Sequence, residues 1–207
     1  ANGYYLDHSE IIQMEEGGRD VTQKDQFYQQ IQLVVEPLKD WLIHAEGNMK
    51  IVNNQNQWEV LPVYYHDGEG SPVAMAWFDG YTPGMSRVNQ SYWKDNNYSL
   101  NLYTDYFKQI GDHYFKVMGG FNAELYKRTN LSGQRDELIT PDVPTLNTGT
   151  TEQKANGGYS HWANAGFFGR INYNYKERYL LEINGRYDGY SRFIGDKRWG
   201  FFPSFSA

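Results

Sequence analysis

The stretch GFFGRINYNYKERYLLEINGRYDGYSRF, residues Gly166 to Phe193, decides the fold because its apolar and polar side chains alternate with a period of two. The odd positions of its second half, from Tyr179 to Tyr187, are apolar, aromatic or Gly, whereas the even positions from Glu182 to Asp188 are polar. The run before the Lys-Glu-Arg segment at 176–178 alternates in the same way. A period of two is that of a β-strand. The stretch therefore predicts a β-hairpin with one apolar face and one charged face.

Two further pairs of segments repeat this pattern. Residues 98–110 and 115–125 alternate around the turn at 111–113, and residues 27–36 and 41–51 alternate around the turn at 37–40. Another strand begins at about Trp199. The sequence thus predicts an all-β fold, an antiparallel meander of three hairpins followed by the start of a seventh strand.

The composition excludes several classes of protein. The chain of 207 residues has a net charge of −6 and no cluster of Lys and Arg, which argues against a nucleic-acid partner. It has no cysteine, so disulfides and thiolate metal sites are impossible. The first 20 residues lack the pattern of a signal peptide, and no apolar run approaches the ~18 residues of a transmembrane helix. A mean hydropathy of −0.75 still permits a membrane barrel, because only every second residue of such a barrel faces lipid.

Loop lengths and aromatic positions favour that membrane barrel. Turns within the hairpins are short, whereas the connections between them are predicted to be long, at 53–97 and 128–164. Outer-membrane barrels have the same asymmetry. Aromatic residues gather near the short turns, where an interfacial girdle is expected; they are Trp41, Tyr106, Phe107, Tyr114, Phe115, Tyr173, Tyr175 and Tyr179. The alternative is a soluble, lipocalin-like barrel with its apolar face inward, because it has the same alternation.

The number of strands predicts that the sequence is incomplete. Barrels that span the outer membrane have at least eight strands, and an open sheet edge in lipid costs several kcal/mol for each unsatisfied backbone group. Residues 1–207 are therefore expected to be a partial β-barrel domain of a longer protein, without its plug and without the ends of the barrel.

Residues 166–206 resemble a specific family. This block, which ends in KRWGFFPSFSA, resembles the C-terminal half of SusC/RagA-type TonB-dependent transporters of the Bacteroidetes outer membrane. Residues 114–150 and 154–170 are similar to the hairpin, outer loop and lead-in that precede the block. The resemblance implies a transmembrane β-barrel of about 22 strands with a plug in its lumen. It also implies energy coupling through TonB and a SusD-like surface lipoprotein that captures glycans or peptides.

One candidate binding site lies in the predicted outer loop of residues 53–93. Aromatic rings there stand next to Asn, Gln and Asp, a combination that suits sugars, because a ring covers the C–H face of a pyranose while amides and carboxylates bond its hydroxyls. The candidate substrate-binding residues are Trp58, Trp77, Tyr81 and Trp93. The alternative is that these rings pack the loop against its neighbours or against the lipoprotein.

The charged face of the last hairpin is expected to point into the lumen. Charges facing lipid would be costly, so Arg170, Glu182, Arg186 and Asp188 are predicted to face the interior and to pair across strands or contact the plug. The histidines have no metal-binding spacing, and no nucleophile stands beside a base. We therefore expect no metal, no cofactor and no catalysis.

Three functions follow from this reading of the sequence. The first is a segment of an outer-membrane active importer of oligosaccharides or similar nutrients. The second is a soluble β-rich ligand-binding module whose apolar face is a core. The third is a passive porin, which would lack the plug and the coupling to TonB.

Overall fold

The structure is a computed structural model that describes residues 10–75 and 83–207. Long β-strands dominate it, accompanied by one short helix and two 3₁₀ turns, labelled η. In chain order the elements are α1 (Glu10–Glu16), β1 (Asp20–Leu38), β2 (Trp41–Val60), β3 (Tyr64–His66), β4 (Pro72–Ala74), β5 (Arg87–Ile110), β6 (His113–Asp136), η1 (Leu146–Thr148), β7 (Lys154–Tyr175), β8 (Tyr179–Tyr190), η2 (Gly195–Arg198) and β9 (Trp199–Ser206).

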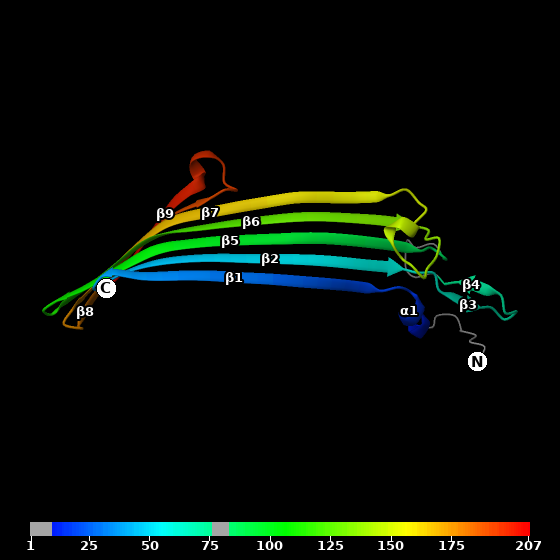
Figure 1. Ribbon diagram of the computed structural model, residues 1–207, viewed down its shortest axis with the longest axis horizontal. Helices are drawn as coiled ribbons and strands as arrows, with labels where there is room; N and C mark the ends of the chain where they lie inside the picture. The colour runs from blue at the N-terminus through cyan, green and yellow to red at the C-terminus, as the bar shows by residue number, and fades with distance from the viewer. Residues whose placement is uncertain (1–9, 76–82) are drawn as a thin grey trace. The chain divides into compact units, whose positions relative to one another are not determined.

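Seven strands form one sheet in the order β1-β2-β5-β6-β7-β8-β9 (Figure 1). The short strands β3 and β4 pair with each other in a separate two-stranded sheet. The seven remaining strands follow one another across the large sheet in the order of the sequence. Strand β8 pairs antiparallel with β7 on one side and with β9 on the other. The predicted all-β meander is therefore confirmed, and β9 begins at Trp199, where the seventh strand was expected.

The strands are longer than the sequence pattern predicted. β2 continues to Val60 and β5 begins at Arg87, so the connection between them is residues 61–86 rather than 53–97. Similarly, β6 runs to Asp136 and β7 starts at Lys154. The missed extensions include NNQNQ at 53–57, which is polar on both faces. Without alternating hydropathy they resemble a loop, although the backbone continues the hydrogen-bonded ladder.

The tight turns use left-handed backbone conformations. Asp40 has φ = 69° in the β1–β2 turn, and Gly111 has φ = 60° in the β5–β6 turn. In the β7–β8 turn Lys176 and Glu177 have φ = 53° and 56°. Short hairpin loops require positive φ because such turns match the right-handed twist of the flanking strands.

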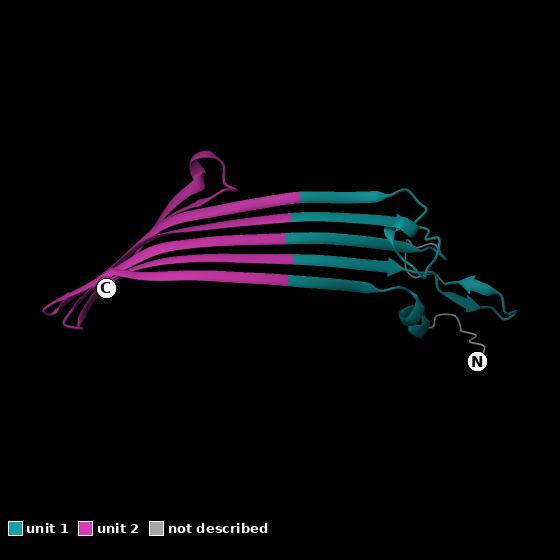
Figure 2. Cartoon of the chain, in the orientation of Figure 1, with its two compact units in different colours: residues 1–25, 53–94, 129–158 teal, residues 26–52, 95–128, 159–207 magenta. Residues whose placement is uncertain are grey.

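The chain divides into two compact units (Figure 2). Unit 1 comprises residues 1–25, 53–94 and 129–158, and unit 2 comprises residues 26–52, 95–128 and 159–207. Unit 1 contains a small apolar cluster of Ile12, Val63 and Met75, against which Tyr65 packs. Unit 2 contains all three tight turns.

Burial in unit 2 is the reverse of that in a soluble protein. Along β5, the apolar Tyr98, Leu100, Leu102 and Tyr106 are 38–45% exposed, whereas the polar residues between them are less exposed and Asp105 is only 8% exposed. Val52 is the only buried hydrophobic side chain among the described residues of this unit. No helix in the described ranges is long and apolar enough to cross a membrane.

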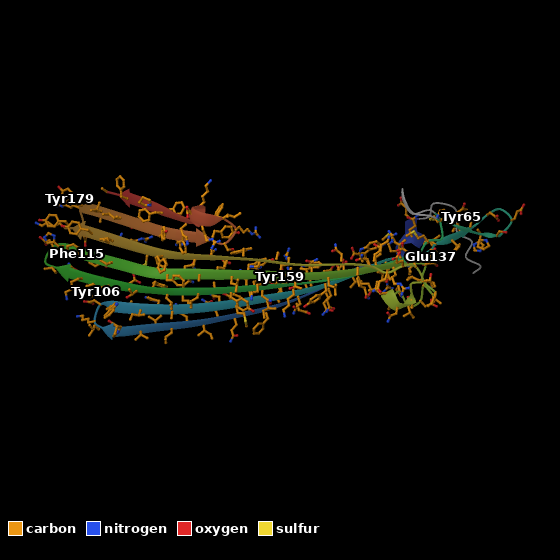
Figure 3. The ribbon with its side chains drawn as sticks, turned by 90° about the horizontal axis from the view of Figure 1, so that it is seen from above. Tyr65, Tyr106, Phe115, Glu137, Tyr159 and Tyr179 are labelled. Carbon is orange, nitrogen blue, oxygen red and sulfur yellow. The ribbon has the colours of Figure 1, made fainter. Side chains whose placement is uncertain are left out.

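Aromatic side chains gather beside the tight turns of unit 2. Figure 3 shows Tyr106, Phe115 and Tyr179 at this end of the sheet. The rings of Phe115 and Tyr173 lie 5.0 Å apart, and those of Tyr175 and Tyr179 lie 6.3 Å apart. The predicted clustering of rings near the turns is therefore present in the fold.

Replacing Gly111 by Val is expected to lower the free energy of unfolding by about 1–2 kcal/mol, because a side chain with a Cβ disfavours its positive φ. Gly47 in β2 is a matched control, since a Cβ at either glycine would meet no atom within 4 Å but Gly47 has no positive φ. Gly47→Val should change stability by no more than about 0.5 kcal/mol. Urea unfolding of the purified full-length protein measures both. Equal losses in the two variants would contradict this account of the turn.

Candidate functional site

The polar face of the β7–β8 hairpin carries a row of hydrogen-bonded side chains. Its register pairs Arg170 with Asn184 and Asn172 with Glu182. Arg170 Nε donates to Asn184 Oδ1 at 2.6 Å, and Asn184 Nδ2 donates to Glu182 Oε1 at 2.7 Å. Asn172 Nδ2 donates to the other Glu182 oxygen at 2.6 Å. The strand ladder thus holds the Glu182 carboxylate between two amides.

An ion pair continues this row toward the start of β7. Arg186 Nη2 and Nε donate to the two carboxylate oxygens of Asp188 at 2.8 and 3.0 Å. Gly166 lies opposite Asp188, and a Cβ at Gly166 would collide with that carboxylate. Arg186 also lies over the ring of Phe168. The register therefore brings all four residues predicted to face the lumen, Arg170, Glu182, Arg186 and Asp188, onto one face of the sheet.

Aromatic residues that sequence reasoning missed stand on β6, β7 and β8. The rings of Tyr126 and Trp162 are stacked with centroids 5.5 Å apart. The ring centroids of Trp162 and Tyr190 are 5.9 Å apart, and those of Tyr190 and Phe193 are 5.7 Å apart. Trp162 and Tyr190 occupy even-numbered positions in their strands, as the polar row does. That parity was a signal that could have identified them.

Carboxylates and amides surround these rings. Tyr126 Oη donates to Asp95 at 2.9 Å, and Arg128 forms a two-pronged ion pair with the same carboxylate at 2.6 and 2.7 Å. Glu124 accepts from Asn97 at 2.8 Å and from Asn164 at 3.3 Å. Hydrogen bonds therefore fix these groups, and the arrangement offers a stacking surface edged by polar groups. We call Glu124, Tyr126, Trp162, Asn164 and Tyr190 the aromatic–amide cluster.

The structure places only two of the four predicted substrate-binding residues. Trp58 lies near the end of β2 and Trp93 lies in β5, so neither is in a loop as predicted, and both are partly buried. Trp77 and Tyr81 lie outside the described residues. A role of these four side chains in binding substrate stays a prediction.

Unit 1 contains a cavity of about 1000 Å³. Amides line much of it, and two of them are linked, because Gln90 Nε2 donates to Gln57 Oε1 at 2.7 Å. Gln57 Nε2 in turn donates to the carbonyl oxygen of Pro144 at 3.1 Å. Neither Trp58 nor Trp93 lines this cavity.

An ion pair joins the ends of β5 and β6 in unit 1. Arg87 Nε and Nη2 donate to Asp136 Oδ1 and Oδ2 at 2.7 and 2.9 Å. This fork lowers the pKa of Asp136 below its usual value, although burial opposes the shift. The described residues contain no group of three or more His, Asp or Glu side chains that could hold a metal ion.

The chain has relatives among the TonB-dependent receptors, although no family model matches it. It is 29% identical over 183 residues to TonB-dependent receptor P26 of Formosa agariphila, a match that covers 83% of the chain and 16% of the receptor. It is 36% identical over 111 residues to TonB-dependent receptor SusC of Bacteroides thetaiotaomicron, which covers 52% of the chain and 10% of SusC.

Solved structures share the fold. The RagAB peptide transporter matches 99% of the chain and 22% of its own chain, with a TM-score of 0.81 and 16% identity. The RagAB peptide importer in the closed-closed state has the same TM-score and 17% identity. The expected resemblance to SusC/RagA-type transporters and the expected fold class, a meander of a large transmembrane β-barrel, are confirmed. The names of these relatives describe receptors and transporters, consistent with the expectation of no catalysis.

Replacing Asp136 by Asn is expected to destabilise unit 1 by about 1–3 kcal/mol at pH 7, because it breaks a charge-assisted fork. The folded-state pKa of Asp136 is lowered, so this contribution is complete above the unfolded pKa of about 3.9 and is lost as the pH falls through the folded value. The stability difference between wild type and variant should therefore shrink below about pH 4.

Urea unfolding at pH 7, 5 and 3 measures this difference. Glu152→Gln is the control, because Glu152 is exposed and has no hydrogen bond or ion pair among the described residues. Its effect should stay small at every pH. A deficit of Asp136→Asn that is the same at pH 3 as at pH 7 would rule out the ion pair as its cause.

Proposed function

Because the chain is related to TonB-dependent receptors of the SusC type, we propose that it forms part of the barrel wall of an active importer in the bacterial outer membrane. The importer takes up oligosaccharides or similar nutrients, is energised through TonB and works with a SusD-like surface lipoprotein. The chain spans 16% and 10% of the two curated relatives described above. These activities are therefore proposed for a whole protein in which residues 1–207 are a partial β-barrel domain.

Reversed burial in unit 2 is the observation that carries this proposal. A soluble sheet hides its apolar side chains, whereas Leu100 and Leu102 of β5 are exposed and Asp105 is buried. Each exposed Leu would lose hydrophobic stabilisation in water, but in lipid it lies in its preferred solvent. The polar residues of the other face then point into an interior where protein or water can satisfy them.

The lengths of the strands support the same placement. A tilted strand crosses the hydrocarbon with about 9–11 residues, whereas β5 and β6 have 24 each. The exposed apolar residues Tyr98 to Tyr106 lie in the half of β5 near its tight turn. We assign this half to the membrane, with the rings of Tyr106, Phe115 and Tyr179 at its boundary (Figure 3).

The soluble binding module is less well supported. It needs an apolar core on one face of the sheet, and the described residues of unit 2 have a single buried hydrophobic side chain, Val52. The small cluster of Ile12, Val63 and Met75 belongs to unit 1.

The aromatic–amide cluster supports an oligosaccharide as the cargo. Trp162 and Tyr190 offer ring faces to the C–H side of a sugar, and Glu124 and Asn164 offer groups that bond hydroxyls. Because the fold alone does not define the cargo, the peptide in the names of the RagAB structures stays a property of RagAB. The resemblance to SusC/RagA-type transporters also motivates the proposed lipoprotein partner.

Replacing Leu102 by Arg tests the membrane assignment. On a lipid-facing site this change should cost about 2–4 kcal/mol, whereas on the surface of a soluble protein it should cost less than about 0.5 kcal/mol. Leu102→Ile keeps the site apolar and serves as the control. The measurement is urea unfolding of the full-length protein refolded into lipid vesicles. An Arg variant as stable as the Ile variant, in a protein that needs no detergent, would favour the soluble module.

Replacing Trp162 by Ala tests the cargo. Loss of the stacking surface is expected to weaken oligosaccharide binding by roughly tenfold in the full-length protein in detergent. Tyr159 is the matched control, because it is an aromatic residue of the same strand at an odd-numbered position, whereas all members of the cluster are at even-numbered positions. Titration calorimetry with neutral oligosaccharides measures the affinity. Equal losses in Trp162→Ala and Tyr159→Ala would argue against a sugar site at the cluster.

A further inference from the structure

A second cavity lies entirely within unit 2 and is rich in cations. Its volume is about 410 Å³, in the range of small-molecule sites. The charged residues of its lining are Arg186, Asp188, Lys197 and Arg198, three cations against one carboxylate. The chain as a whole has a net charge of −6, so this excess of positive charge is local and is not a general property of the protein.

Two of the three cations are available to a ligand. Asp188 already neutralises Arg186 through the two-pronged ion pair. The side-chain ammonium of Lys197, on η2, has no hydrogen bond or ion pair among the described residues. Arg198 donates from Nε to the carbonyl oxygen of Phe193 at 3.3 Å, and neither of its Nη groups has a hydrogen bond within the described part of the chain. The cavity therefore has about two uncompensated positive charges, which favour an anion.

The same cavity has a hydrogen-bond acceptor in need of a donor. Asn164 lines it, and Asn164 Nδ2 donates to a carboxylate oxygen of Glu124. Because a carboxylate can only accept, this bond fixes the orientation of the amide and leaves Oδ1 as the free acceptor. That Oδ1 is buried without a hydrogen-bond partner. A ligand hydroxyl would satisfy it and would remove the penalty of a buried, unpaired polar atom.

Aromatic rings complete the lining. Tyr190 and Phe193 both border the cavity, and their rings meet nearly edge to face. Such rings suit the C–H face of a sugar. The lining residues Asn122, Asn164 and Arg186 occupy the even-numbered positions of the polar face. A lipid headgroup is therefore disfavoured, because lipid would meet the opposite, apolar face.

From these features we propose that the cavity binds an acidic sugar unit of the cargo, one that carries a carboxylate or a sulfate. This inference rests on the proposed function in oligosaccharide import. Lys197 and Arg198 pair with the acid group, Asn164 Oδ1 accepts from a hydroxyl, and Tyr190 and Phe193 cover the ring. A neutral sugar could bond Asn164 and stack on the two rings, but it has no acid group to pair with Lys197 and Arg198. The cavity thereby determines specificity for charge.

The test compares two oligosaccharides of equal length, oligogalacturonate as the acidic probe and malto-oligosaccharide as the neutral one. Their affinities are measured by titration calorimetry on the full-length protein in detergent. The variant is Lys197→Gln combined with Arg198→Gln. The control is Lys39→Gln combined with Lys108→Gln, which removes the same charge from two exposed lysines elsewhere in unit 2. Lys197→Gln alone is a second variant, because it disturbs no hydrogen bond of the described residues.

We expect the double variant to bind the acidic probe about tenfold more weakly, and the single variant to show part of that loss. The neutral probe should change by less than about twofold, as should both probes in the control. Raising the salt concentration should weaken acidic binding more in wild type than in the double variant.

Other results would overturn the proposal. One such result is that wild type binds both probes and the double variant keeps its affinity for both, or loses affinity for both equally. The cationic cavity is then not the acidic-sugar site, although the proposed import of oligosaccharides stands. If wild type binds neither probe, the proposed cargo and the cavity's role fail together. If an acidic peptide binds through Lys197 and Arg198 while oligogalacturonate does not, the ligand is a peptide.

Discussion

The pairing of every backbone N–H and C=O along the ladder is the constraint on which the rest of this structure depends. In lipid no water can replace a missing partner, so a spanning segment must satisfy its backbone within the sheet. The ladder also imposes a period of two on the side chains. Each strand consequently has two faces that can be chemically opposed. In β5 the Leu100 face and the Asp105 face differ in this way, although both belong to one continuous strand.

The polar face depends on mutual neutralisation. The carboxylate of Glu182 is held by two amides, that of Asp188 by Arg186 and that of Asp95 by Arg128. Fixed cross-strand registers allow the contacts of Asn172 with Glu182 and of Arg128 with Asp95, since a slip of one residue would move each partner to the other face. Arg186 and Asp188 lie two residues apart on β8, so the period of the strand itself places them on one face. Where this neutralisation is incomplete, near Lys197 and Arg198, the face has charge left for a ligand. The proposed ligand site is thus the place on this polar face where the charged side chains are not paired with one another.

Sequence reasoning succeeded where one face had to be apolar. Lipid or a core enforces the alternation of apolar and polar side chains along a strand. That alternation predicted the tight turns, the shared face of Arg170 and Arg186, and the start of β9. Sequence reasoning failed where neither face had to be apolar, as in residues 53–57, because backbone hydrogen bonds between strands leave no mark on composition.

The candidate site was predicted only in part, for the same reason. Trp162 stands among Ser, His, Ala and Asn, so nothing local distinguished it from a loop residue, and its contacts with Tyr126 and Tyr190 come from other strands. The cavity near Lys197 depends on the path of a loop after β8, which no period in the sequence determines.

The unusual length of the strands has a consequence for evolution. Only about 9–11 residues of a strand must satisfy lipid, whereas β5 has 24. The part near Ile110 can accept few changes on one face, while the part near Arg87 keeps its ladder with almost any side chain that does not break a strand. Mutational tolerance should thus rise along one continuous strand. Substitutions can therefore accumulate in the part of the strand outside the membrane while the membrane part stays unchanged. New binding specificities can arise in this way without a new fold.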